Sequence, residues 1–478
     1  MAVDTSRTFD LVVLGGGTGG YSAAFRAGQL GLRTALVEEA RIGGTCLHWG
    51  CIPTKAMLES ADLFARVRNA AEYGLRVGET GVDMEAIAHR RGAVVERLTK
   101  GLMGLVKKNH VEFVHGRGVL EGGTRVRVAL AGEDGTPGAG GERVLEATDV
   151  ILASGSRVKS LPGLVPDGSR IVTSEDILRS SSIPASIVVV GAGAVGVEFA
   201  SFYQDMGTQV TLLEYLPGIL PLEDAEVARV VQRAFTRRGM KIVTSARFDP
   251  SSVTIDETGI CVVVGPDGGE AAELRAEQML VATGRAANVE NVGLESTTAA
   301  VEKGVVKVDG WMRTAQPHLY AIGDVAGGLL LAHVAAHEGI VAVETITGAD
   351  PDPIDYLKMP RTTYCRPQVA SIGRSEEELR RDGVDFRAGR FPFIANAKAL
   401  IGGDYEGFVK VIADAATDQV LGVHMVGPHV TDLIAEASAG MLLDATAWEI
   451  GAAVHPHPTL SEALGEAALA VAGRAINV

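Results

Sequence analysis

Two cysteines are the first residues in this chain whose type and spacing point to chemistry. Cys46 and Cys51 lie in the stretch GGTCLHWGCIPTK and make up half of the four cysteines in 478 residues. So few cysteines are typical of a reducing compartment, where a close pair is more often catalytic or metal-binding than a structural crosslink. Three interpretations follow, namely a redox pair, half of a metal site, or a short disulfide.

The metal and crosslink interpretations have little support. A structural zinc site needs about four ligands, and no second Cys or His pair lies near the two that Cys46 and Cys51 would supply. Cys261 and Cys365 each stand alone, so we expect no metal. A structural disulfide would close a very small loop and gain little from chain entropy.

The redox interpretation has positive support. Pro53 suits the first turn of a helix, which would place Cys51 at the helix N-terminus. The helix dipole there lowers the pKa of a thiol, and Lys55 adds positive charge one turn on. The pattern therefore favours a dithiol/disulfide pair that exchanges electrons with a bound flavin.

A histidine pair near the C-terminus could supply the base that thiol chemistry needs. The stretch VHPHPTLSEALGEA contains His455, His457 and Glu462, and Pro458 predicts a helix that opens there, with Glu462 in its first turn. Histidine suits proton transfer near neutral pH when a carboxylate orients its ring. On spacing alone, surface or capping histidines remain an equal alternative.

Two similar segments must position these groups. The first has an apolar strand at 9–14, then a glycine turn, an Ala-rich helix to about Leu30, and a strand from Thr34 to Val37 that ends at Glu38. A second copy near mid-chain ends at Glu214, and in both copies the acid lies 23 residues after the first glycine. The glycines of the two copies are Gly15, Gly17 and Gly20, and Gly191, Gly193 and Gly196.

This repeat predicts two dinucleotide sites. Glycines let the backbone approach a pyrophosphate at a helix N-terminus, and the acid accepts hydrogen bonds from an adenosine ribose. The segments ILASGSRVKSLPG and MLVATGRAANV each place a glycine after an apolar strand, so we expect the chain to cross between the two nucleotide domains there. HLYAIGDVAGG predicts a further strand ending at Gly323-Asp324.

The rest of the chain predicts a Gly-rich loop and a third type of domain. Residues 132–142 should join two strands, the first at 125–130. After the Pro/Asp linker PDPIDY, helices and alternating strands (EGFVKVIAD, VLGVHMVG) predict an α+β domain. The expected domains are 1–150, 151–280, a central segment 281–350 that completes the first site, and 351–478.

The composition restricts the class of partner. A net charge of −15 argues against non-specific nucleic-acid binding. No run of 18 apolar residues predicts a membrane span, and the stretch MAVDTSRTFD shows no secretory signal. We therefore expect a cytoplasmic protein with no nucleic-acid or membrane partner.

Taken together, these motifs resemble one family along nearly the whole chain. GGTCLHWGCIPTKAML, GAGAVGVEFA, AIGDVAGGLLLAH, FPFIANAKALIGGDYEGFVKVIAD and HPHPTLSEA match, in order and spacing, the dihydrolipoamide dehydrogenases, which are flavin-dependent disulfide oxidoreductases. The resemblance implies an α/β fold with two Rossmann-like domains, for FAD and NAD, and a C-terminal α+β dimerisation domain.

The resemblance also implies the site residues and their roles. Cys46 would be attacked by the substrate, Cys51 would be the sulfur beside the flavin, and His457 would be the base that Glu462 orients. Asp324 would contact the ribityl chain of FAD, and Glu198 would lie by Lys55 and the nicotinamide. The FAD residues would be Gly15, Gly17, Gly20, Glu38, Lys55, Gly118, Ser154, Gly155, Ser156, Asp324, Leu330, Leu331, Ala332 and His333, and the NAD residues Gly191, Gly193, Gly196, Glu198, Glu214 and Gly284.

The implied activity is oxidation of dihydrolipoamide with NAD+, in a homodimer whose histidine completes the partner's site. The implied partners are the lipoyl domains and acyltransferase core of 2-oxo-acid dehydrogenase complexes. His48, Trp49, Pro456 and Gln368 depart from the usual family pattern. The alternatives are a glutathione-like reductase, which Glu214 disfavours by repelling a 2′-phosphate, a mercuric reductase, which would end in a cysteine pair, and a largely structural subunit.

Overall fold

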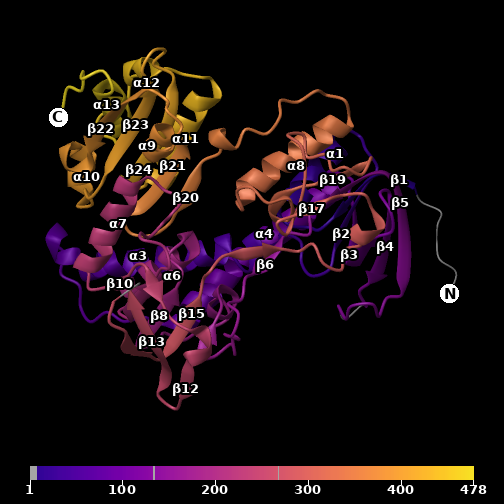
Figure 1. Cartoon of the computed structure of the whole chain (residues 1–478), viewed down its shortest axis with the longest axis horizontal. Coiled ribbons are helices and arrows are strands. Elements are labelled where there is room, and N and C mark those ends of the chain that lie inside the picture. Colours follow the sequence, from indigo (N-terminus) through magenta and orange to yellow (C-terminus); the bar gives the residue numbers. More distant parts are fainter. Residues whose placement is uncertain (1–7, 133–134, 267–268, 478) are drawn as a thin grey trace. The chain divides into compact units, whose positions relative to one another are not determined.

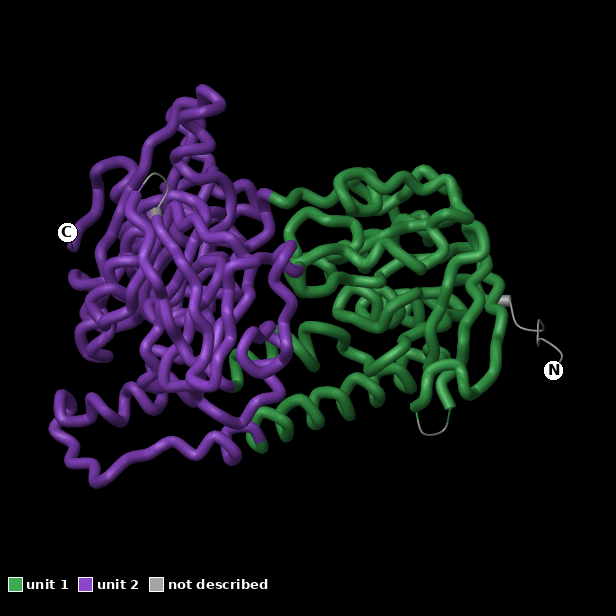
Figure 2. The backbone as a smooth tube through the Cα atoms, turned by 60° about the horizontal axis from the view of Figure 1, so that its bottom comes forward, with its two compact units in different colours: residues 1–56, 89–159, 285–356 green, residues 57–88, 160–284, 357–478 purple. Residues whose placement is uncertain are grey.

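The computed structural model of the protein describes residues 8–132, 135–266 and 269–477. Residues 133–134 of the predicted Gly-rich loop, and residues 1–7 of the stretch read for a secretory signal, lie outside the described residues. The chain forms two compact units, shown separately coloured in Figure 2. Unit 1 holds residues 1–56, 89–159 and 285–356, and unit 2 holds residues 57–88, 160–284 and 357–478.

Unit 1 is built on a six-stranded sheet, visible in Figure 1. β1 lies between β2 and β5, and β19, β5, β1, β2 and β3 run parallel, while β4 pairs antiparallel with both β3 and β5. Apolar residues of β1 are fully buried on both faces, as expected for a central parallel strand. The strands are β1 (Thr8–Leu14), β2 (Thr34–Glu38), β3 (Glu112–Leu120), β4 (Arg125–Leu130), β5 (Glu142–Leu152) and β19 (Leu319–Ala321).

Two helices of unit 1 pack closely enough to exclude side chains between them. A Cβ atom on Gly339 of α8 would lie 2.7 Å from the carbonyl oxygen of Gly19 in α1. Small residues at the crossing therefore let α1 and α8 approach and cover the sheet. The helices that begin in unit 1 or cross its boundary are α1 (Thr18–Gln29), α2 (Gly44–His48), α3 (Cys51–Arg68), α4 (Met84–Lys108) and α8 (Ala332–Ile346).

Unit 2 contains a second parallel sheet, in the order β10-β9-β8-β15-β7, with a small antiparallel sheet beside it. Helix α6 follows β8 through the second glycine turn, as the sequence predicts. The elements are β7 (Ile171–Val172), α5 (Ser174–Ile177), β8 (Ser186–Val190), α6 (Ala194–Asp205), β9 (Gln209–Leu213), α7 (Ala225–Arg237), β10 (Lys241–Val243), β11 (Ala246–Arg247), β12 (Thr254–Asp256), β13 (Gly259–Pro266), β14 (Ala272–Ala276) and β15 (Gln278–Val281).

The C-terminal part of unit 2 is a five-stranded antiparallel sheet, in the order β20-β21-β24-β23-β22, with helices packed on it (Figure 1). This α+β arrangement was predicted from the sequence. Its elements are β20 (Arg361–Thr363), β21 (Gln368–Gly373), α9 (Glu376–Arg381), β22 (Phe386–Pro392), α10 (Ala397–Gly402), β23 (Phe408–Asp414), β24 (Val420–Gly427), α11 (Val430–Leu442), α12 (Ala447–Ala452) and α13 (Glu462–Ala470).

Strands β23 and β24 are buried on both faces, because Phe408 and Val426 enter the core that includes α7, while Val409 and Met425 enter the core formed with α11 and α13. One local prediction for this region is wrong, since the last helix begins at Glu462 rather than at Pro458.

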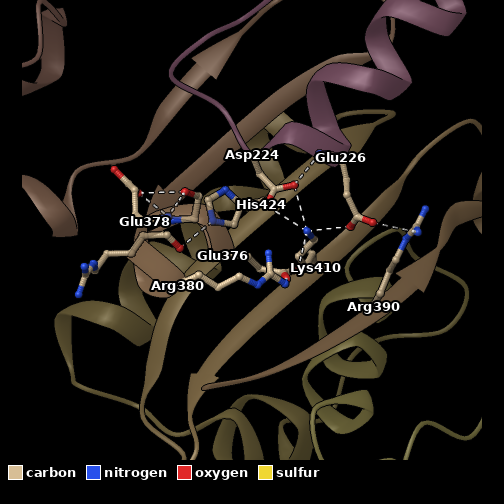
Figure 3. A network of polar contacts seen from close by, with 10 residues as sticks. Asp224, Glu226, Glu376, Glu378, Arg380, Arg390, Lys410 and His424 are labelled. Atoms are coloured by element: carbon tan, nitrogen blue, oxygen red, sulfur yellow. Dashed lines mark hydrogen bonds and ion pairs between the residues drawn. The ribbon is translucent and has the colours of Figure 1, made fainter. Parts of the chain in front are cut away.

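A network of charged side chains lies on the α7 side of this sheet (Figure 3). Lys410 of β23 contacts the carboxylates of Asp224, Glu226 and Glu376 at 3.0, 2.7 and 2.8 Å. Its side chain is 3% exposed and that of Asp224 is 0% exposed. The start of α7 is thus held to the C-terminal sheet by a desolvated ion cluster.

At two places the chain passes between the units within the segments that the sequence predicts. These boundaries fall after Lys159 and before Arg285, next to β6 (Ser156–Val158) and β16 (Arg285–Ala287), which pair antiparallel. The boundaries after residues 56 and 88 were not predicted. Residues 57–88 pack with unit 2. The predicted fold class is confirmed. Among the described residues, no helix combines the length and apolar character that crossing a bilayer requires.

Candidate functional site

The two cysteines lie on two consecutive helices. Cys46 is in α2, and Cys51 is the first residue of α3, which confirms the predicted helix N-terminus. Both cysteines are half-buried, and the Cys46 side chain is hydrogen-bonded to Cys51. The two sulfur atoms therefore lie side by side.

The surroundings of the pair hold the proton on Cys46. The hydrogen bond to Cys51 raises the pKa of the Cys46 thiol, and burial and the charge of Cys51 raise it further. Thr18, through a hydrogen bond, and the charge of Lys55 act in the opposite direction on that pKa. Cys51 opens α3, where the helix dipole favours a negative charge.

Two residues beside the cysteines were not predicted from the sequence. Burial raises the pKa of Tyr21, and the charges of Cys46 and Cys51 raise it further, so this phenol lies close to both sulfurs. The side chain of Thr18, one turn before Tyr21 in α1, forms hydrogen bonds with Tyr21 and with Cys46. The i, i+3 spacing directly after the glycine turn was the signal available in the sequence.

The unusual residues between the cysteines shape the loop. Nε2 of His48 lies 2.8 Å from the carbonyl oxygen of Ile42, and burial lowers the pKa of His48, so the ring stays neutral at physiological pH. The rings of His48 and Trp49 are 5.3 Å apart. Trp49 also lines the cleft described next.

Unit 1 contains a cleft of about 710 Å³ along the carboxyl ends of its parallel strands. This is where doubly wound sheets bind ligands. Gly17 lines the cleft and caps α1, and a Cβ atom there would meet nothing within 4 Å, so the space over it is open. The other lining residues that were predicted for FAD are Gly15, Glu38, Gly118, Ser154, Gly155 and Ser156.

The glycine turn fits a dinucleotide. Gly15 has φ = 113°, and a Cβ atom on Gly20 would lie 1.8 Å from the carbonyl oxygen of Gly15, so both positions need glycine. The amide of Gly16 donates to Glu38 at 2.7 Å, and Ala40 donates to the other Glu38 oxygen at 2.7 Å. Burial raises the pKa of Glu38, while these two amides act in the opposite direction.

Asp324 joins this region through other side chains. Ser156 donates a hydrogen bond to Asp324 and receives one from Nε of Arg285 at 2.6 Å. The neighbouring Gly323 amide donates to Glu338 at 2.6 Å. Arg285 and Glu338 are thus candidate positioning residues that the sequence analysis missed, because their partners are distant in sequence.

Some predicted FAD residues do not line the cleft. Gly20, Lys55 and Asp324 lie outside its lining, as do the four residues from Leu330 to His333 at the start of α8. Lys55 instead influences Cys46, as described above. Gly118 does line the cleft and is close-packed, since a Cβ atom there would lie 2.3 Å from Cδ1 of Leu14.

Unit 2 contains a second glycine turn with nearly the same backbone geometry. Gly191 has φ = 102°, and a Cβ atom on Gly196 would lie 1.8 Å from its carbonyl oxygen. Gly193 caps α6 with open space over it, like Gly17 in unit 1. The amide of Ala192 donates to Glu214 at 2.7 Å, so the predicted second site has the same geometry as the first.

Two further residues predicted for NAD lie in unit 2. Glu198 is buried in α6, and its Oε1 accepts a hydrogen bond from the Tyr364 amide at 2.9 Å. Gly284 follows β15 with φ = 105°, a conformation that favours glycine.

The predicted acid–base pair is formed. Nδ1 of His457 lies 2.8 Å from Oε1 of Glu462, and the imidazole is 73% exposed. Burial raises the pKa of Glu462, but the amide of Thr459 and the His457 side chain outweigh it, so the net pKa is lowered. This pair lies in unit 2 and the cysteines lie in unit 1. The described residues contain no cluster of His, Cys, Asp or Glu suited to a metal.

Comparisons with known proteins agree with this site. Residues 9–339 match the pyridine nucleotide-disulphide oxidoreductase family, and residues 359–468 match its dimerisation domain. The chain is 45% identical to dihydrolipoyl dehydrogenase of Bacillus subtilis over 98% of this chain and 99% of that protein. It is 44% identical to the enzyme of the same name from Zymomonas mobilis, with the same coverage.

A solved structure agrees as well. The crystal structure of LpdA from Mycobacterium tuberculosis superposes with a TM-score of 0.88 at 29% identity, over 96% of this chain and 98% of that one. The sequence match spans both units, and it includes the glycine turns, the cysteine pair and the C-terminal sheet. The chain therefore belongs to the pyridine nucleotide-disulphide oxidoreductase family.

Proposed function

We propose that this chain oxidises dihydrolipoamide to lipoamide and transfers the electrons to NAD+. The observation that carries the proposal is the hydrogen-bonded Cys46–Cys51 pair, with Cys51 opening a helix and Thr45, next to Cys46, lining the dinucleotide cleft. The curated relatives at 40–45% identity over nearly the full chain are dihydrolipoyl dehydrogenases, which supports lipoamide as the substrate.

FAD and NAD are the cofactors of this family, and FAD when bound supplies the two-electron acceptor between the dithiol and NAD+. The open space over Gly17 and Gly193 supports a dinucleotide pyrophosphate at each turn. We assign FAD to residues 1–150 and 281–350, NAD to residues 151–280, and the subunit interface to residues 351–478.

The chain's own residues carry the thiol chemistry. His457, oriented by Glu462, takes the proton of one substrate thiol, and the resulting thiolate attacks the sulfur of Cys46 in the oxidised pair. The Cys46–Cys51 bond breaks, and Cys51 leaves as the thiolate that its helix N-terminus stabilises. The second substrate thiol then attacks the substrate sulfur that is bonded to Cys46, which closes the lipoamide ring. Cys46 leaves and takes up the proton of that thiol, so the pair has gained two electrons.

Glu214 supports NAD rather than NADP. Its two oxygens accept from the Ala192 and Leu216 amides, which holds the carboxylate in place at the end of β9. A fixed negative charge there repels a 2′-phosphate. A glutathione-like reductase would have to bind that phosphate, because it uses NADPH.

We also propose a cytoplasmic homodimer that serves lipoyl domains and the acyltransferase core of 2-oxo-acid dehydrogenase complexes. The match of residues 359–468 to a dimerisation domain supports the dimer. The exposed His457 supports a role on a second subunit, and exposed apolar side chains of the same region support an interface. These side chains are Leu442, Leu443, Trp448 and Val454.

A steady-state assay tests the function directly. Dihydrolipoamide and reduced glutathione are each offered with NAD+ and with NADP+, and we expect turnover only with dihydrolipoamide and NAD+. Turnover only with glutathione and NADP+ would contradict the proposal. A largely structural subunit would show no long-wavelength change in its visible spectrum when dithiol is added.

A further inference from the structure

The loop that carries His457 must be held by contacts outside itself. Residues 453–461 connect α12 to α13 without regular secondary structure. The His457 ring is 73% exposed, so packing alone does not orient it. A base that is to receive a proton from a substrate thiol needs a defined position, and this requirement rests on the proposed function.

His455 ties the loop to a different helix. Its Nε2 lies 2.7 Å from Oε1 of Glu436, which is in α11. The His455 side chain is 11% exposed, whereas that of Glu436 is 38% exposed. The contact therefore joins a nearly buried imidazole to a partly exposed carboxylate. It anchors the loop two residues before His457.

A glycine in α13 makes room for this ring. A Cβ atom on Gly465 would lie 2.8 Å from both Cε1 and Nδ1 of His455. The imidazole therefore packs directly on the backbone of α13, where any other residue would displace it. Gly465 is three residues after Glu462, so His455 lies against the helix face that presents the carboxylate partner of His457.

A second contact holds the other side of the loop. Nδ2 of the buried Asn396 donates to the carbonyl oxygen of Thr459 at 3.0 Å. The amide of Thr459 donates to Oε2 of Glu462 at 2.8 Å, and its hydroxyl donates to the carbonyl oxygen of Pro456 at 2.7 Å. His457 thus lies between an anchor at His455 and an anchor at Thr459.

We propose that His455, clamped between Glu436 and Gly465, is a positioning residue that holds His457 for proton transfer. His455 does not exchange the proton itself, since its ring is nearly buried and its Nε2 is bound to Glu436. Releasing the clamp leaves Glu462 on its helix but frees the loop that brings His457 to it. Proton transfer then becomes slower, while substrate binding changes less.

The kinetic test uses three variants that break the clamp in different ways. His455→Ala and Glu436→Ala each remove one polar partner, and Gly465→Ala displaces the ring without changing any polar group. We expect kcat for dihydrolipoamide to fall about 10- to 100-fold in each, because misplacing a reacting group by about 1 Å costs up to this much. KM should change much less.

Matched controls separate positioning from damage to the fold. Glu436→Gln keeps an oxygen acceptor for His455 and should retain most of the activity, whereas His89→Gln, at an exposed position in α4, should behave as wild type. NADH-dependent reduction of ferricyanide does not use the thiol base and should be unchanged in all variants. The His455→Ala/Glu436→Ala double variant should be no slower than either single variant, because both remove one contact.

Hydrogen exchange tests the clamp independently of activity. The Thr459 amide, which donates to Glu462, should exchange faster in His455→Ala than in wild type. Unchanged exchange at Thr459, or additive losses in the double variant, would overturn the proposal. If wild type lacks dihydrolipoamide activity, the proposed function fails, and the Thr459 amide still decides whether His455 holds the loop.

Discussion

The ammonium of Lys410 lies 3.0 Å from each carboxylate oxygen of Asp224, in a part of the protein from which water is excluded. Asp224 caps α7, and Lys410 belongs to the central part of the C-terminal sheet, so this ion pair links two layers of unit 2 (Figure 3).

Replacing Lys410 by methionine should destabilise the protein strongly. The change leaves Asp224 buried without its cation, and losing one partner of a buried pair costs about 3–5 kcal/mol. Urea denaturation measures the free energy of unfolding. Lys307→Met is the control, because its pair with Glu302 is exposed and is expected to contribute less than about 1 kcal/mol. Equal losses in both variants would contradict the assigned role.

The same network predicts a pH dependence of stability. Burial lowers the pKa of His424, which is fully buried beside Asp224. The unfolded chain therefore binds a proton below about pH 6.5 that the folded chain does not. Stability should fall as pH drops from about 6.5 toward the lowered pKa of His424, by up to about 1.4 kcal/mol per pH unit.

His424→Gln isolates this contribution. In wild type, Nε2 of His424 lies 3.0 Å from the carbonyl oxygen of Arg374. The amide group of glutamine can still donate a hydrogen bond to that oxygen. Thermal unfolding midpoints of the two proteins, measured between pH 7 and pH 5, should fall more steeply for wild type than for His424→Gln as pH drops, because the variant has no imidazole to protonate. Parallel curves would assign the acid sensitivity to another group.

The cysteines should be separable from flavin binding. Cys46→Ser removes the attacked sulfur and should reduce dihydrolipoamide turnover by about 10³-fold or more. The dinucleotide cleft is formed by other residues, so the purified variant should keep its flavin absorbance. Cys261→Ser, in β13, is the control with turnover expected at the wild-type level. Wild-type turnover of Cys46→Ser would refute the assigned attack site.

The two glycines of the second turn should respond differently to alanine. A Cβ atom on Gly193 meets nothing in the chain, so Gly193→Ala should fold normally and lose affinity for NAD+ by about tenfold, since the methyl group fills the approach to the turn. Gly196→Ala should instead destabilise the fold by about 1–3 kcal/mol or more, because its Cβ would lie 1.8 Å from the Gly191 carbonyl oxygen. Calorimetric titration and urea denaturation measure the two effects.

The proposed homodimer predicts complementation between inactive subunits. A heterodimer of one Cys46→Ser subunit and one His457→Gln subunit, isolated through two affinity tags, should have about half of the wild-type activity, since one of its two sites keeps both intact groups. Each homodimer alone should be inactive. An inactive heterodimer would place Cys46 and His457 of the same subunit in one site.

The residues that the sequence predicted correctly share short-range causes. Cys51 opens α3 as Pro53 indicates, and Glu38 follows its strand–turn–helix unit at the expected distance. His457 meets Glu462 although the helix begins four residues later than predicted. In each case backbone sterics and hydrogen bonds within about one supersecondary unit decide the geometry.

Only the tertiary structure decided which distant side chains contact the functional and structural residues. Arg285 reaches Ser156 across 129 positions, Lys410 reaches Asp224 across 186, and Glu436 meets His455 from another helix. Nothing in a local pattern identifies such contacts, because each requires complete sheets and helices to bring polar groups together away from water. The sequence by itself determined which chemical groups are present and on which elements, while folding decided which distant side chains hold them in place.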